Sequence, residues 1–447
     1  MKHLFTLILC ASIAPAVHGQ EVSLGDCISQ GIARNLTLEN ARIDISKGRT
    51  AVTQNRSRLL PVISGSLQWT DYLKSPVNVT TGTRLGSDFP DDPTWQTIKS
   101  MPYSATAGVQ LSMPLYDKGI FSGIEVARTV ERIRSLSYEK AVEDLTVQIG
   151  RVYYAAQASR EQERLAQENI DRMKALCLIT EALYEQGVVM EVDLNRVRIN
   201  LKNLEAVHDQ CLTLHRQQLH LLRYLMDLSP DEPLEVTRMD EDFSGPHTAG
   251  GVNDHLPELK LTAQQQVLAE QRIKSVRASR LPMLSFSAYA GGLAYQEKFT
   301  HFFSTSAAKD NWFGHSFVGL TMRVPLFDGN SRRLQIRQYS LEAMQAAHRS
   351  ALVRQQMDKD YAQASLQLKH NVEVLRTQTD SRRQAEEVYQ VTEEQYKEGV
   401  SSMTALLQDE MQLRTAQTAC VQALCQCRLA ELDLLRLSGQ LSQLSNP

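Results

Sequence analysis

Residues 103–117 read YSATAGVQLSMPLYD, an alternating run closed by the motif Met113-Pro114-Leu115-Tyr116-Asp117. A second alternating run closes about 211 residues later with Val324-Pro325-Leu326-Phe327-Asp328. Two further landmarks recur in the same order and at nearly the same offset: a Leu-Pro pair at Pro61 and Pro282, and a Tyr-x-x-Gly-Val motif at 184–188 and 396–400. Three ordered coincidences predict that the chain contains two copies of one structural unit.

Each copy contains two alternating runs of about ten residues, at about 62–72 and 103–114 and then at about 283–295 and 312–325. One face of each run is apolar and the other carries small and hydroxyl side chains, which is the length and pattern of an outer-membrane β-strand. Pro61 and Pro282 then mark strand entries, whereas Pro114 and Pro325 mark strand exits. The same alternation also fits a half-buried sheet of a soluble protein.

The rest of each copy is predicted to be helical. Residues 118–186 contain no proline, and residues 330–398 contain neither proline nor glycine. At roughly 1.5 Å per residue, each helix would be on the order of 100 Å long. Gly187 and Gly399 follow, and glycine permits the left-handed backbone of a tight reversal. Residues at heptad spacing then predict a return helix that packs as a coiled coil, so each copy ends in a long helical hairpin with its tip near 187 or 399.

The domain boundaries follow from these patterns. Residues 1–19 combine Lys2, a short apolar run and small residues before Gln20, which predicts a secretory signal peptide. The first repeat is expected at 20–230, a linker with proline and glycine at 231–254, the second repeat at 255–440 and a tail at 441–447. Cys10 follows Leu9 rather than a small residue, which weighs against lipidation of the N-terminus.

Charge and motif content argue against several functions. A net charge of −3 over 447 residues is unlike that of a nucleic-acid-binding protein. Cys420 and Cys427, like His208 and His215, lie seven residues apart at heptad positions, where packing explains them better than metal binding. We find no phosphate-binding loop, zinc-protease motif or serine-hydrolase motif. The sequence therefore predicts no enzyme, no cofactor and no metal site, and it leaves the pairing of its cysteines open.

On these landmarks the chain resembles the TolC-like outer-membrane efflux family over about residues 23–440. The resemblance rests on the doubled strand entries, the Pro-Leu-Tyr/Phe-Asp exits and the Tyr-x-x-Gly tips. It implies a mainly α-helical fold with a small membrane β-barrel. Three subunits would share one twelve-stranded barrel on an α-helical periplasmic tunnel, in the outer membrane. The implied partners are two further copies of the chain, outer-membrane lipid, a periplasmic adaptor protein and an inner-membrane transporter.

The resemblance also implies where the sites lie. The adaptor would dock on the tips, at Tyr184, Gly187, Val188, Tyr396, Gly399 and Val400, although the same motifs are equally explained as efficient turns. A periplasmic gate would lie just past the tips, at Asp193, Met403, Ala405, Leu406, Gln408 and Asp409. Asp193 matches an acidic position that helps hold relatives closed, whereas Ala405 and Gln408 stand where relatives can carry acidic residues. A steric closure by Met403, Leu406 and Leu407 is the alternative to an acidic gate.

The sequence thus predicts the outer-membrane exit duct of a tripartite efflux or type I secretion system, which passes substrate passively to the exterior. A secreted coiled-coil scaffold without a channel is the alternative, and a self-contained porin or adhesin is a third reading. The cargo is not specified by any residue pattern that we recognise.

Overall fold

The computed structural model of the chain describes residues 21–81, 95–243, 251–303 and 312–444. The predicted signal peptide lies outside the described residues. The chain forms two compact units. Among the described residues, the hairpin unit comprises those within 21–45, 133–263 and 347–444, and the strand unit comprises those within 46–132 and 264–346. Both units draw on both sequence repeats, because long helices begin in one unit and end in the other.

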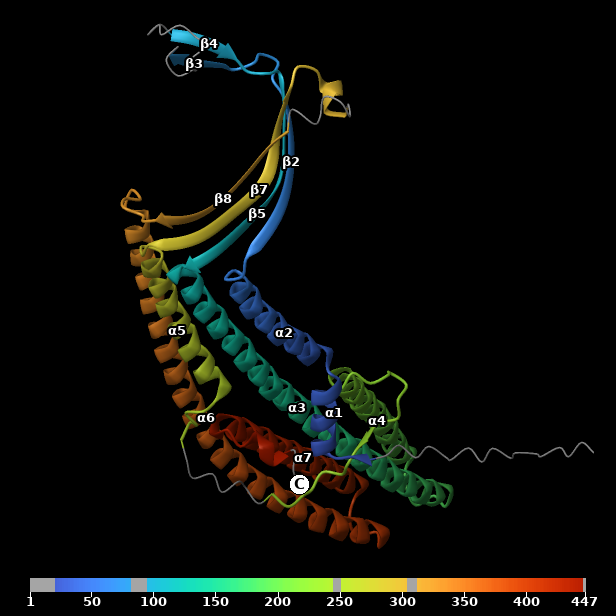
Figure 1. Cartoon of the computed structure of the whole chain (residues 1–447). Coiled ribbons are helices and arrows are strands. Elements are labelled where there is room, and N and C mark those ends of the chain that lie inside the picture. Colours follow the sequence, from blue (N-terminus) through green and yellow to red (C-terminus); the bar gives the residue numbers. More distant parts are fainter. Residues whose placement is uncertain (1–20, 82–94, 244–250, 304–311, 445–447) are drawn as a thin grey trace, which may run out of the picture. The chain divides into compact units, whose positions relative to one another are not determined.

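A four-stranded antiparallel sheet dominates the strand unit (Figure 1). Its order is β2 (Val62–Asp71), β5 (Tyr103–Tyr116), β7 (Met283–Gln296) and β8 (Trp312–Arg323). The register aligns the apolar positions of all four strands on one face, since Ile63 pairs with Leu111, Leu111 with Ala288 and Ala288 with Val318. This apolar face is open to solvent: Leu67 is 79% exposed and Val318 is 76% exposed.

The proline landmarks occupy different places relative to the strands. Pro61 and Pro282 stand directly before β2 and β7, and Pro325 follows the end of β8. Pro114, predicted to mark a strand exit, instead lies inside β5, which continues to Tyr116 past a shift in register against β7. Proline has no N–H to donate to the ladder, and a bulge is a place where a strand accommodates it.

The aspartates that end the two strand-exit motifs begin the long helices. The Asp117 carboxylate accepts the backbone N–H of Gly119 at 2.8 Å, just where α3 (Lys118–Glu185) starts. The Asp328 carboxylate accepts the N–H of Arg332 at 3.1 Å at the start of α6 (Ser331–Lys397). Such capping satisfies N–H groups that have no partner within the helix. The motif is therefore a strand end followed by a helix cap.

Short elements lie between the strands of each pair. β3 (Val77–Thr81) pairs antiparallel with β4 (Trp95–Lys99), and the 3₁₀ helix η2 (Phe299–Phe303) follows β7. Two more helices, α2 (Leu36–Ser57) and α5 (Pro257–Ala278), precede β2 and β7. No helix among the described residues is both long and apolar enough to cross a membrane.

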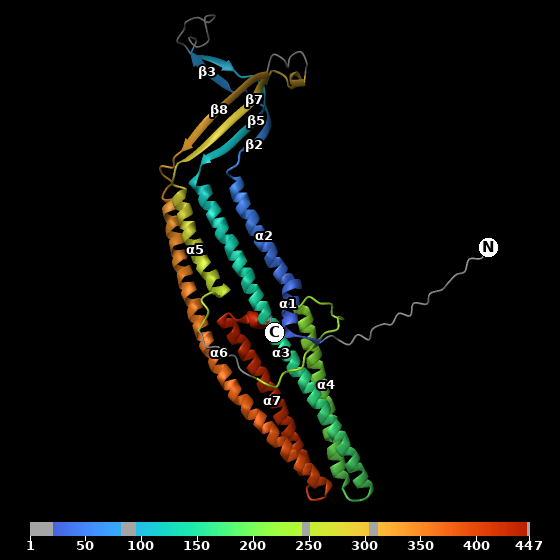
Figure 2. The same ribbon diagram turned by 60° about the horizontal axis from the view of Figure 1, so that its bottom comes forward.

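Two helical hairpins form the hairpin unit, and their tips lie at the same end of it (Figure 2). α3 turns into α4 (Glu191–Leu225), and α6 turns into α7 (Met403–Ser438). The heptad positions of α7 are buried, with Leu406 and Cys427 at 0% exposure. Cysteine acts there as a small apolar side chain, and all six described cysteines are free. The remaining elements of this unit are β1 (Glu21–Val22), α1 (Leu24–Arg34), β6 (Glu235–Val236) and η3 (Leu441–Leu444).

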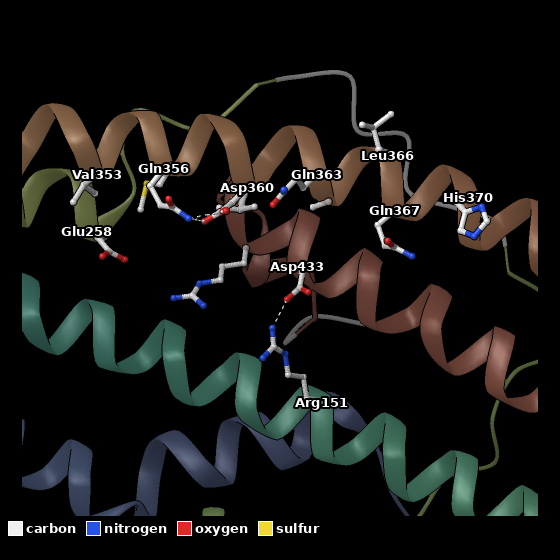
Figure 3. Close-up of a pocket in the computed structure, with 14 residues that line it drawn as sticks. Arg151, Glu258, Val353, Gln356, Asp360, Gln363, Leu366, Gln367, His370 and Asp433 are labelled. Atoms are coloured by element: carbon white, nitrogen blue, oxygen red, sulfur yellow. Dashed lines mark hydrogen bonds and ion pairs between the residues drawn. The ribbon is translucent and has the colours of Figure 1, made fainter.

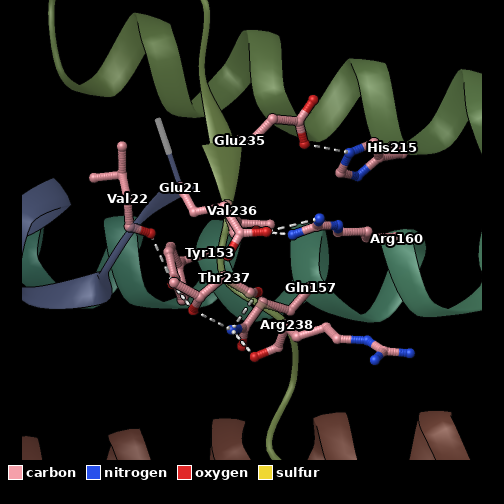
Figure 4. Close-up of polar contacts among 10 residues, drawn as sticks. All are labelled: Glu21, Val22, Tyr153, Gln157, Arg160, His215, Glu235, Val236, Thr237 and Arg238. Carbon is pink, nitrogen blue, oxygen red and sulfur yellow. Dashed lines mark hydrogen bonds and ion pairs between the residues drawn. The ribbon is translucent and has the colours of Figure 1, made fainter. Parts of the chain in front are cut away.

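β1 pairs in parallel with β6, which lies in the first part of the predicted linker, and hydrogen bonds join this strand pair to α3 (Figure 4). The Tyr153 hydroxyl donates to the Val22 carbonyl at 3.0 Å, and the Gln157 amide donates to the Thr237 carbonyl at 2.9 Å. His215 is buried, 3.2 Å from the Ala156 carbonyl and 3.7 Å from the Glu235 carboxylate. The position of His215 is therefore explained by packing and by these polar partners.

Ion pairs join the two hairpins beside a groove of about 850 Å³ (Figure 3). Arg151 of α3 meets Asp433 of α7 at 2.7 Å, and Arg436 of α7 meets Asp144 of α3 at 2.5 Å. Next to the ion pair of Arg436 and Asp144, burial raises the pKa of Glu143 to about 7. Arg436 opposes this shift, whereas Asp144 raises the pKa further. The carboxyl group of Glu143 is therefore easier to bury when it is neutral.

We expect Glu143→Gln to stabilise the protein above about pH 7 and to have little effect at pH 4. The folded-state pKa is raised, so the contribution of Glu143 to stability is fully present below its unfolded pKa and is lost as the pH rises through about 7. Thermal unfolding of both proteins at a series of pH values would measure this. A stabilisation by Gln that is the same at pH 4 and pH 8 would contradict the prediction.

Candidate functional site: the hairpin tips

Each hairpin turns through the same backbone motif. Gly187 has φ 72° and Gly399 has φ 77°, which is the left-handed region that favours glycine. At the first tip the Gly187 N–H donates to the Tyr184 carbonyl and the Val188 N–H donates to the Leu183 carbonyl, both at 2.9 Å. The second tip repeats this pair of bonds at 3.0 and 2.8 Å. This is the Schellman arrangement, which satisfies the last carbonyls of a helix.

The two tips nevertheless present different surfaces. Tyr184 is 41% exposed, whereas Tyr396 is 7% exposed and belongs to the core between the hairpins. Val188 and Val400 are 68% and 74% exposed, so they are the apolar side chains of the predicted docking set that remain open at both tips. The identical Tyr-x-x-Gly spacing could not separate the tyrosines, because their burial depends on the neighbouring hairpin.

The predicted gate residues also differ in their burial and in their partners. Met403 and Leu406 are 5% and 0% exposed and pack in the core with Val197. In this conformation both side chains are buried between the two hairpins. Ala405 donates its N–H to the Ser402 side chain, which caps α7, and Asp409 accepts the Thr392 hydroxyl at 2.7 Å. Gln408 is exposed.

Arg196 connects the two hairpins just behind the tips. Its guanidinium donates to the Asp193 carboxylate at 3.0 Å and reaches the Thr404 hydroxyl of the other hairpin at 3.4 Å. The sequence pointed to Asp193 alone. The i, i+3 spacing of Asp193 and Arg196 was a signal for their ion pair, but only the tertiary structure brings Thr404 to it.

A buried polar layer follows further along the hairpins, and the sequence did not reveal it. Glu410 is 7% exposed, and burial raises the pKa of its carboxyl group while Arg414 and Arg172 oppose the shift. The Arg172 guanidinium lies 6.0 Å from the centre of the Tyr389 ring, which is a favourable cation–π arrangement. Among the described residues no group of three His, Cys, Asp or Glu side chains is placed to hold a metal ion.

Comparisons with known proteins agree with this architecture. The chain is 23% identical over 345 residues to the pyoverdine export outer membrane protein OpmQ of Pseudomonas aeruginosa, covering 74% of this chain and 68% of that protein. The crystal structure of the outer membrane protein VceC from Vibrio cholerae matches with a TM-score of 0.74 at 15% identity, over 95% of this chain and 97% of that chain. The open state of the Neisseria gonorrhoeae MtrE outer membrane channel matches with a TM-score of 0.72 at 17% identity, over 94% and 89%. These two structures share its fold.

The model of one protein family, described as outer membrane efflux protein, matches residues 27–227 and 253–440. Each matched segment contains one pair of strands of the four-stranded sheet and one helical hairpin. The family is one of transport ducts rather than enzymes, and it resides in the outer membrane with helices that extend into the periplasm. The chain therefore belongs to the outer membrane efflux protein family.

Proposed function

We propose that three copies of the chain assemble into one twelve-stranded barrel on a helical periplasmic tunnel, and that this trimer is the passive exit duct of a tripartite efflux or type I secretion system. The observation that carries the proposal is the sheet. Among the described residues, β2 and β8 each have a strand partner on one side only. Open edges invite pairing with another chain, and four strands are too few to close a barrel alone.

The two faces of the sheet support the same assembly. Ile63, Leu67 and Val318 share the apolar face, which suits lipid, whereas Ser64, Ser66 and Ser112 share the opposite face, which suits water. An outer-membrane barrel needs this division between the outside and the lumen. The name of the relative OpmQ mentions pyoverdine export, and we propose by analogy that this duct also passes small molecules that an inner-membrane transporter delivers.

The orientation of the sheet is testable with two neighbouring residues. Leu67→Arg places a charge on the proposed lipid face, where it costs about 2–4 kcal/mol near the bilayer midplane. We expect this variant to yield much less heat-modifiable trimer in outer-membrane fractions. Ser66→Arg is the matched control on the proposed lumen face and is expected to retain the trimer. Equal trimer yields from the two variants would argue against the proposed orientation.

We propose that the link between the hairpins, rather than the apolar residues that pack them, holds the periplasmic end closed. Opening the periplasmic end requires the hairpins to separate near their tips. The bond from Arg196 to Thr404 spans the two hairpins, whereas Arg198 pairs with Glu181 at 2.6 Å within the first hairpin. The two arginines on α4 therefore offer a matched comparison.

We expect Arg196→Ala to raise single-channel conductance in planar bilayers and Arg198→Ala to leave it near the wild-type value. A hydrogen bond contributes about 0.5–1.5 kcal/mol. Losing one in each of three subunits would raise the open population by about tenfold or more. Equal conductance of Arg196→Ala and wild type, or an equal rise with Arg198→Ala, would show that this link does not hold the gate.

The adaptor is proposed to contact the exposed valines at the tips. Val188→Asp combined with Val400→Asp places a charge in each contact. A charge buried without a partner costs about 1–3 kcal/mol, so we expect export to fall about tenfold or more. The trimer itself should persist, since both side chains are exposed. Val188→Thr with Val400→Thr keeps the size and should export normally. Normal export by the aspartate variant would place the docking surface elsewhere.

A further inference from the structure

A cluster of aromatic rings lies across β7 and β8. Tyr289 stacks on His315, with ring centres 4.9 Å apart and planes at 30°, and on Phe317, at 5.9 Å and 19°. Phe313 precedes His315 by two residues on the same strand, so its side chain points to the same side of the sheet. We call these four residues the aromatic ladder.

The ladder lies on the face of the sheet that is otherwise polar. Tyr289 pairs with Gln110, and Gln110 pairs with Ser64, so the ladder shares its face with the hydroxyl side chains. Alternation of small polar residues predicted no large rings on this side. Phe313 and Phe317 are 57% and 53% exposed, and His315 is exposed as well. Three rings are thus open to solvent on the face that we propose lines the duct.

Packing explains Tyr289 but not the other three rings. The Tyr289 ring reaches over the glycines of two strands: a Cβ added at Gly108 would lie 2.3 Å from its hydroxyl oxygen, and one added at Gly291 would lie 2.5 Å from it. The glycines therefore provide the space that fixes this ring, and its buried hydroxyl has no hydrogen-bond partner among the described residues. The space that these glycines provide is not occupied by the rings of Phe313, His315 and Phe317.

A neighbouring copy would not cover the exposed rings. In the proposed barrel the free edge of β8 meets β2 of the next subunit. On this face β2 carries Val62, Ser64, Ser66, Gln68 and Thr70. Val62 is the one apolar side chain among them, and it is too small to bury two phenylalanines. Lipid contacts the opposite face. The space beside these rings is therefore left to water and, in the proposed duct, to the molecule in transit.

Resting on the proposed duct, we propose that the aromatic ladder is a contact site for transported molecules that carry a planar aromatic ring. The exposed faces of Phe317 and His315, held in place by stacking on Tyr289, offer offset-stacked partners to such a ring. In the trimer the site occurs three times around the lumen. It slows and concentrates aromatic cargo within the barrel, whereas aliphatic cargo of the same size and charge passes without stacking.

The test compares two probes of equal charge and similar size, tryptophan amide and cyclohexylalanine amide, added to the trimer in planar bilayers. Current block by each probe is measured for the wild type and for the double variant Phe317→Leu/His315→Gln, both with and without Arg196→Ala to open the periplasmic end. Phe286→Leu is the matched control, because it makes the same substitution on the lipid face of β7.

We expect tryptophan amide to block the wild type at concentrations about tenfold lower than cyclohexylalanine amide. The double variant should lose this preference, and Phe286→Leu should keep it. Ionic current without a preference for the aromatic probe, or a preference that survives in the double variant, would overturn the ladder proposal and leave the duct intact. Absence of current in both backgrounds, together with absence of heat-modifiable trimer from outer-membrane fractions, would overturn the duct and the ladder together.

Discussion

The register of the four-stranded sheet is the constraint on which the rest of the molecule depends. Ile63, Leu111, Ala288 and Val318 come from four strands in two sequence repeats, and successive backbone pairings bring them to one face. Side chains alternate along a strand, so a slip of one residue in one strand would move its apolar residues to the hydroxyl face. The proline entries and the aspartate helix caps fix where strands and helices meet, and this limits such slips.

Duplication explains why the two hairpins share their backbone but not their chemistry. The Schellman bonds at Gly187 and Gly399 repeat almost without change, because any helix that reverses tightly must satisfy its last carbonyls. The side chains around these turns diverge. Tyr184 is open to solvent, Tyr396 is buried, and Arg196 of one hairpin reaches Thr404 of the other. The proposed docking surface and the proposed link between the hairpins need this asymmetry, and the shared turn permits it.

Several features were predictable because they depend on neighbours close in the chain. The strands, the long helices, the turn glycines and the heptad burial of α7 all follow from periodicity and local backbone preferences. Other features were not predictable. Pro114 lies inside β5 because a bulge against β7 accommodates it, and β3 and β4 are too short for their pattern to be distinctive. Met403 and Leu406 have the same apolar character whether they line an opening or pack a core.

The sequence by itself determined the doubled architecture of strands and hairpins, the family and the position of the tips, because these rest on spacing and on residues with restricted backbones. Only the tertiary structure decided which side chains are buried, exposed or paired. It buried Glu410 beside Arg172 and Tyr389, paired Arg196 with Thr404, and gathered Tyr289, His315 and Phe317 on one face. The physical reason is that burial and contact depend on segments that are distant in the chain, whereas periodicity records only which face a residue shares with its near neighbours.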